Sequence, residues 1–282
     1  MKIRKPCVAG AFYERSEKEL QNQITNCFTH KLGPGRVPKL SDGKKKILGF
    51  VVPHAGYMYS GPVAAHSYSQ LASDGTPDAV IILGPNHTGL GSGVSIMTKG
   101  GWQTPLGVAT IDTPLAEQIR NSSSIIDDDE TAHVSEHSIE VQLPFMQFLY
   151  GDKIRFVPVC MMMQDLRTSQ EVARSIAEQT KGKHVVVIAS SDFTHYEPQD
   201  VASRNDKAAI EAIISLDGSK LNELGDTGRV TMCGYGPITT LIELATLVGD
   251  VQAKLLSYHT SGDITADASS VVGYSSILFT HE

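Results

Sequence analysis

The chain has 282 residues, of which 41% are hydrophobic and 20% are charged. This composition allows a buried core and excludes general disorder. The 31 acidic residues outnumber the 24 basic ones, and the net charge of −7 disfavours a nucleic-acid or anionic-membrane surface as the main function.

The length fits one large domain or two small ones. We find no internal repeat and no low-complexity linker, so we expect a single domain over residues 1–282. The N-terminal sequence MKIRKPCVAGAFY has no signal-peptide core, and no segment is long and apolar enough to span a bilayer. The four cysteines, Cys7, Cys27, Cys160 and Cys233, are scattered without a CxxC pair, which predicts a reducing, cytoplasmic environment.

Predicted strands and helices alternate along the chain. An N-terminal helix is followed by a loop rich in Pro and Gly at Gly33–Lys46. Compact runs with many β-branched residues predict buried strands at Ile47–Val52, Ala79–Leu83, Arg155–Cys160 and His184–Ala189. Apolar residues at helical spacing predict helices at Gln170–Lys181 and Ile238–Val248.

This alternation predicts an α/β fold with a mainly parallel central sheet and helices on both faces. Three further segments are typical of antiparallel or edge strands: Val94–Thr98, Val108–Ile111 and Val271–Phe279.

Polar side chains directly follow three of the predicted buried strands. His54 lies in VVPHAGY, His87 lies in IILGPNHTG, and both Asp192 and His195 lie in VIASSDFTHY. In open α/β sheets the carboxyl ends of the strands face the ligand crevice. A single histidine in such a position is more often a core residue or a cap, whereas the group together favours a ligand or catalytic pocket.

Cys233 lies in the glycine-rich loop TMCGYGPIT, and Pro237 is suited to the first position of the following helix. A thiol near a helix N-terminus is close to the positive end of the helix dipole, which favours the thiolate form that binds metals or attacks electrophiles. The alternative is a small buried side chain under the loop, an interpretation that suits Cys160 better.

The segment HVSEHSIEVQLPF carries Glu136, His137 and Glu140 at spacings that a helix would bring near one face, with Pro144 restarting the helix. Glu136 and His137 are either groups that orient a ligand or substrate, or part of a polar helix start capped by Ser135. The HExxH motif of zinc proteases is absent. GxSxG, Walker A and GxGxxG motifs are also absent, which leaves a serine hydrolase, an NTPase and a dinucleotide enzyme without support.

Seven motifs in order resemble those of the Memo family and extend across nearly the whole chain. They are AGAFY, PHAGYMYSG, LGPNH, TPLG, EHSIEVQLPF, SSDFTHY and CGYGPI. The family occurs in archaea, bacteria and eukaryotes, and it was named for a role in cell motility. The resemblance implies a fold similar to that of class III extradiol dioxygenases, which are non-haem iron enzymes that open catechol rings.

By this resemblance, His54, His87 and Cys233 fall on the family's metal-binding positions. Asp192 and His195 fall on catalytic positions of its pocket, with His195 placed like the acid/base histidine of the dioxygenases. Phe12 falls where the eukaryotic members carry an aromatic residue by the pocket, and Tyr57, Glu136 and His137 complete the expected pocket residues.

The expected third ligand differs from that of the dioxygenases. They hold iron(II) with two histidines and a carboxylate, whereas Cys233 would supply a thiolate. A thiolate is softer and more easily oxidised, and it also accepts copper and zinc. We therefore expect iron(II) or copper, with zinc as a competitor, and we do not carry ring cleavage over.

Three functions remain open at this point. The first is a metal-dependent redox protein, in which His195 exchanges protons and Asp192 orients a neighbouring group. The second is a non-enzymatic module that binds a peptide or small ligand in the same cleft, without nucleic acid or membrane. The third is a hydrolase or lyase that uses a zinc-bound water.

Overall fold

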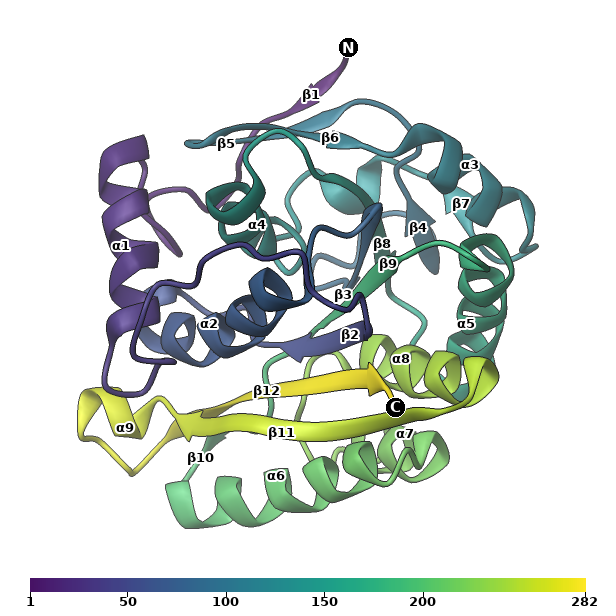
Figure 1. Ribbon diagram of the computed structural model, residues 1–282. Coiled ribbons are helices and arrows are strands. Elements are labelled where there is room, and N and C mark those ends of the chain that lie inside the picture. Colours follow the sequence, from purple (N-terminus) through teal and green to yellow (C-terminus); the bar gives the residue numbers. More distant parts are fainter.

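Hydrogen bonds join the strands into one 12-stranded sheet in the computed structural model, which describes residues 1–282 (Figure 1). The strands are β1 (Ile3–Arg4), β2 (Ile47–Val52), β3 (Ala79–Pro85), β4 (Val94–Ile96), β5 (Gly101–Thr104), β6 (Gly107–Ile111), β7 (Asp127–Asp128), β8 (Arg155–Met161), β9 (Val185–Ser190), β10 (His195–Glu197), β11 (Val251–Thr260) and β12 (Val271–His281). The main path through the sheet has the order β1-β5-β6-β8-β3-β9-β2-β12-β10.

The centre of the sheet, β8-β3-β9-β2, is entirely parallel. These are the four predicted buried strands, and they are confirmed with small changes at their ends. The additions are mixed in direction. β4 is antiparallel to β8 and β12 is antiparallel to β2, whereas β6 is parallel to β8 and antiparallel only to β5.

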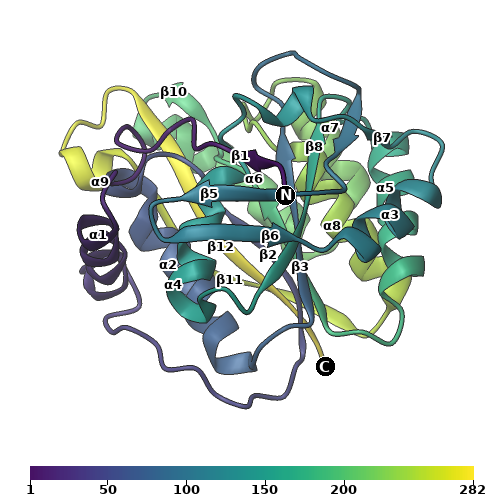
Figure 2. The same cartoon turned by 90° about the horizontal axis from the view of Figure 1, so that it is seen from above.

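Helices cover both faces of the sheet, as the alternating pattern predicted. The helices are α1 (Glu17–Thr29), α2 (Tyr57–Asp74), α3 (Thr113–Asn121), α4 (Leu143–Tyr150), α5 (Leu166–Thr180), α6 (Gln199–Ile214), α7 (Gly218–Asp226), α8 (Tyr235–Val248) and α9 (Gly262–Thr265). Figure 2 shows α1, α2 and α4 on one side of the strands and α3, α5 and α8 on the other. None of the helices is both long and apolar enough to cross a membrane.

Close packing of α8 on the sheet depends on Gly49 in β2. A Cβ atom at this position would lie 2.3 Å from the carbonyl oxygen of Val187 and 2.8 Å from Cδ1 of Leu241 in α8. The glycine therefore lets fully buried Leu241 pack directly against the strands. Burying a leucine side chain stabilises a fold by roughly 1.5–3 kcal/mol.

Two helix boundaries differ from the sequence expectation. α8 begins at Tyr235, so Pro237 is inside the first turn, where its missing N–H needs no partner. No helix forms from Glu136 to Ile139, where the Glu136 carboxylate accepts the N–H groups of His137 and Ser138. A 3₁₀ turn at Glu140–Gln142 and α4 follow, with Pro144 in the first turn.

Arg4 in β1 fastens the N-terminal strand to the loop that carries Glu136. Its Nε donates to the carbonyl of His133 at 2.6 Å, and its Nη2 donates to the carbonyl of Glu136 at 2.6 Å. Its Nη1 forms a buried ion pair with Glu140 Oε2 at 2.5 Å. The guanidinium carbon also lies 4.1 Å from the ring centroid of Trp102. One side chain thus holds three points of the loop.

We expect Arg4→Met to lower the free energy of unfolding by about 3–5 kcal/mol, since it leaves a buried carboxylate unpaired. The matched control is Arg174→Met, which removes an exposed ion pair with Glu171 and should change stability by about 0–1 kcal/mol. Urea denaturation measures both. Equal effects of the two substitutions would contradict the role assigned to Arg4.

Candidate metal centre

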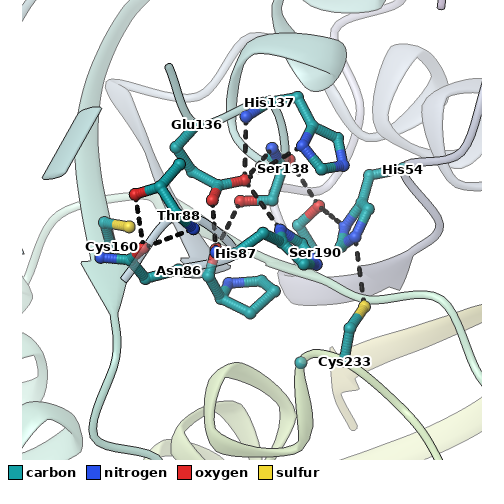
Figure 3. A network of polar contacts seen from close by, with 12 residues as sticks. His54, Asn86, His87, Thr88, Glu136, His137, Ser138, Cys160, Ser190 and Cys233 are labelled. Carbon is teal, nitrogen blue, oxygen red and sulfur yellow. Dashed lines mark hydrogen bonds and ion pairs between the residues drawn. The ribbon is translucent and has the colours of Figure 1, made fainter. Parts of the chain in front are cut away.

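Three imidazole rings meet at the carboxyl edge of the parallel strands (Figure 3). His54 follows β2, His87 follows β3, and His137 belongs to the loop before the 3₁₀ turn. One ring nitrogen from each lies within 4.8 Å of the others. The ring centroids of His54 and His87 are 5.3 Å apart, and the rings of His87 and His137 stack at 4.6 Å.

The His87 ring is oriented by Glu136, whose side chain is buried. Its Nδ1 lies 2.9 Å from Glu136 Oε1, and the His87 backbone N–H donates to Oε2 at 2.5 Å. Burial alone would raise the pKa of Glu136, but the hydrogen bonds and charge of His87, with the Ser138 N–H, lower it to about 2. Glu136 is therefore a carboxylate that holds Nδ1 of His87 and leaves its Nε2 free.

The His54 ring is oriented by a hydroxyl group instead. Its Nδ1 lies 2.8 Å from Ser190 Oγ, and its Nε2 lies 3.2 Å from Cys233 Sγ. Burial, together with the neighbouring His137 and His87, lowers the pKa of His54 well below its ordinary value. The ring is therefore neutral, with one nitrogen available as a lone-pair donor.

Cys233 contacts His54 but does not join the three imidazoles within the same 4.8 Å limit. Its Sγ accepts the N–H of Asp192 at 3.3 Å. Burial, and then the Asp192 carboxylate, raise the pKa of the thiol well above its ordinary value. The expected thiolate is therefore disfavoured in the unligated side chain, because burial and the Asp192 charge both raise its pKa. A bound cation would be needed to displace the proton.

Asp192 and His195 lie beside this cluster in different roles. Asp192 Oδ1 accepts the backbone N–H groups of His54 at 2.8 Å and Ala55 at 3.3 Å, so it holds the turn after β2. Burial raises its pKa to about 6. His195 Nδ1 lies 2.7 Å from the carbonyl of Thr231, to which it donates, and Nε2 remains for proton exchange.

A cleft of about 690 Å³ opens over the cluster. Its lining includes all three clustered histidines, Asp192 and His195, and it contains no lysine or arginine. The aromatic residues of its walls are Phe12, Tyr59, Tyr196 and Tyr274. Phe12 meets the His137 ring edge-on at 4.8 Å. A cavity of about 780 Å³ at the amino ends of β2 and β9 contains none of the predicted site residues.

Two of the expected pocket residues do not line the cleft. Tyr57 is buried in α2 and donates its hydroxyl to the carbonyl of Val141 at 2.6 Å, so its assignment to the pocket is corrected. It follows the turn residues of PHAGY and points into the core. Glu136 lies behind His87 and acts on the cleft through the His87 ring and through its contacts with His137.

Ser190, Gln142 and Thr231 are functional neighbours of the site that no sequence motif predicted. Ser190 ends β9 and contacts His54, Gln142 donates to Ser190 Oγ at 2.9 Å, and Thr231 fixes His195. The position of Ser190 shortly before Asp192 could have indicated its role, because residues at the end of a strand lie at the same edge of the sheet as the site. No local sequence feature indicated a role for Gln142 or Thr231.

Comparisons with known proteins agree on one family. A family model described as Memo-like protein matches residues 4–278. A MEMO1 family protein of Methanopyrus kandleri is 51% identical over 98% of each chain, and one of Methanothermobacter thermautotrophicus is 50% identical over 96% of this chain and 98% of its own.

A solved structure, that of an uncharacterized protein from Escherichia coli K12, shares the fold with a TM-score of 0.58. It is 14% identical and covers 82% of this chain and 99% of its own.

We expect Glu136→Gln to lower the free energy of unfolding by about 1–3 kcal/mol at pH 7, because an amide cannot accept all four N–H groups. The folded pKa of about 2 lies below the ordinary 4.5, so the carboxylate's contribution is complete above about 4.5 and is lost as the pH falls towards 2. Urea denaturation from pH 7 to pH 3 should therefore show the difference shrinking. Glu17→Gln on the exposed start of α1 is the control, and a constant difference would refute the assignment.

Proposed function

The chain belongs to the Memo family, and from this premise we propose that it binds a redox-active metal ion, iron(II) or copper, at His54, His87 and a third ligand. The observation that carries the proposal is the convergence of three imidazole rings, two of which, His54 and His87, have Nδ1 held by a buried group. Metal-binding histidines typically have such a partner, which fixes the ring and raises its basicity.

The donor atoms present fit a transition metal. Ligand atoms lie about 2.0–2.3 Å from an ion, so two of them are separated by at most about 4.6 Å. The 3.2 Å between His54 Nε2 and Cys233 Sγ meets this condition. The 4.8 Å limit on the imidazole nitrogens requires a small inward movement, and Cys233 Sγ, which lies outside the cluster defined by that limit, must also move inward. Neutral imidazole and sulfur are donors that suit iron, copper and zinc rather than magnesium or calcium.

The third ligand is Cys233 in this proposal, with His137 as its competitor. Cys233 would give two imidazoles and a thiolate, and the cation would supply the charge that desolvation denies to the sulfur. His137 would give three imidazoles, but its Nδ1 also lies 3.4 Å from Glu136, and its ring is packed between His87 and Phe12. Cys233 Sγ lies 3.2 Å from His54 Nε2, and its use as the ligand leaves the His137 ring free to wall the cleft.

A bound iron or copper ion would supply one-electron chemistry and a positive charge at the floor of the cleft. The chain's own groups supply the rest. His195 presents Nε2 for proton exchange because Thr231 holds its Nδ1, and Asp192 keeps the His54 turn in place. The lining contains Asp192 and Asp267 but no lysine or arginine, which disfavours an anionic small molecule or peptide segment. Ring cleavage of catechols is not part of the proposal, because no carboxylate is offered as the third ligand.

The aromatic cleft also favours a second candidate function, the binding of a peptide or small ligand without chemistry. Tyr196 is 77% exposed and Met58 is 63% exposed at the cleft, where apolar atoms face solvent. Such a function would survive removal of the metal, whereas the redox function would not. The free cysteines fit a reducing cytoplasm in either case.

We expect protein purified without oxygen to contain iron or copper, measured by elemental analysis. Cys233→Ser should bind the metal more than about tenfold more weakly and therefore lose it on dialysis, since a neutral hydroxyl replaces an anionic sulfur. His137→Ala should retain it. Cys27→Ser in α1 and His66→Ala in α2 are matched controls away from the cluster. The reverse pattern would make His137 the third ligand, and full retention in both variants would remove both residues from the site.

We expect His195→Ala to bind metal as the native protein does but to lose any redox turnover, because its ring faces the cleft without joining the imidazole cluster. Metal titration followed by a turnover assay under oxygen separates the two effects. Thr231→Val removes only the hydroxyl that accepts the backbone N–H of His195 and keeps the carbonyl that accepts its ring N–H, so it should reduce turnover less. Loss of metal in His195→Ala would instead make His195 a ligand.

A further inference from the structure

We propose that Ser190 and Gln142 are positioning residues that hold the His54 ring in the tautomer whose Nε2 carries the lone pair facing Cys233. The inference rests on the proposed metal site, because it explains why Nε2 is the ligating atom. The tautomer of His54 follows from the hydrogen bonds that the buried Ser190 hydroxyl group donates and accepts.

The Ser190 hydroxyl has a single hydrogen, and it is already committed. Ser190 Oγ lies 2.7 Å from the carbonyl oxygen of Ser138. A carbonyl can only accept, so the hydroxyl must donate to it. Ser190 Oγ can then act towards its remaining neighbours only as an acceptor.

The orientation of the Gln142 amide agrees with this. Its Nε2 lies 3.0 Å from the carbonyl of Pro53 and 2.9 Å from Ser190 Oγ, while its Oε1 accepts the Tyr68 hydroxyl at 2.7 Å. Turning the amide over would place its oxygen against the Pro53 carbonyl, where neither atom has a hydrogen to offer. Because the network is buried, water is not at hand to repair such a mismatch.

The remaining contact sets the tautomer of His54. Its Nδ1 lies 2.8 Å from Ser190 Oγ, which has no hydrogen left, so Nδ1 must be the donor. A neutral imidazole carries only one ring hydrogen, and Nε2 is therefore bare. Nε2 lies 3.2 Å from Cys233 Sγ, in position to accept the thiol hydrogen or to bind an ion.

The two metal-binding histidines are thus fixed by different chemistry. Glu136 fixes His87 with a charged carboxylate, whereas Ser190 fixes His54 with a neutral hydroxyl. Asp192 already lies against the His54 backbone, so a hydroxyl fixes the ring without placing another negative charge beside it. Loss of a group that supports a metal ligand in this way typically costs about 10–100-fold in metal affinity.

The test is long-range ¹H–¹⁵N NMR on metal-free protein labelled with ¹⁵N-histidine, with the His54 signals assigned through His54→Gln. Wild type should show His54 protonated at Nδ1. Ser190→Ala removes the acceptor, so the population protonated at Nε2 should grow, and Zn²⁺ affinity in a competition titration should fall about 10–100-fold. The control is Ser67→Ala, which deletes an equally buried hydroxyl paired with Ser276 and should leave tautomer and affinity unchanged.

Either the wild-type protein or the Ser190→Ala variant can overturn the proposal. A wild-type ring protonated at Nε2 overturns it without any variant. It is also overturned if Ser190→Ala keeps the wild-type tautomer, or if its Zn²⁺ affinity matches that of Ser67→Ala. If wild type is protonated at Nδ1 but binds no Zn²⁺, the tautomer assignment stands and the proposed metal function fails.

Discussion

The parallel register of the central strands is the constraint on which the site depends. Val52 of β2 pairs with Ser190 of β9, and Leu83 of β3 pairs with Ala189, so these strands end level with one another. The chain then leaves the sheet at one edge, and His54 and His87 emerge a few residues beyond it. Antiparallel pairing in this part of the sheet would have sent successive strand ends to opposite edges and separated the two rings.

Polar groups brought together at a buried edge must find partners, and this requirement organises the second layer of the site. Glu136, Ser190 and Asp192 each satisfy backbone or ring N–H groups that would otherwise be stranded. The same contacts fix the histidine rings, so stability and preorganisation come from one set of hydrogen bonds. Arg4 extends this network to the N-terminal strand, which is far away in sequence.

Desolvation decides the behaviour of the cysteine. A helix start favours a thiolate, yet the buried surroundings of Cys233 and the carboxylate of Asp192 act more strongly in the opposite direction. The sulfur is therefore a poor anion until a cation compensates it. In the proposed metal site, metal binding and thiol deprotonation would be a single coupled event, which would limit oxidation of the unligated side chain, because the thiolate is the reactive form.

The sequence by itself determined the α/β class, the central strands and the positions of His54 and His87, because β-branched runs and strand-end residues are local signals. It also carried the motifs by which the family was recognised. Only the tertiary structure decided that His137 joins the imidazole cluster and that Tyr57 points away from the cleft. It also decided that Ser190, itself hydrogen-bonded by Gln142, contacts the His54 ring. These facts depend on hydrogen bonds between segments far apart in the chain, and local spacing contains no information about which donor meets which acceptor.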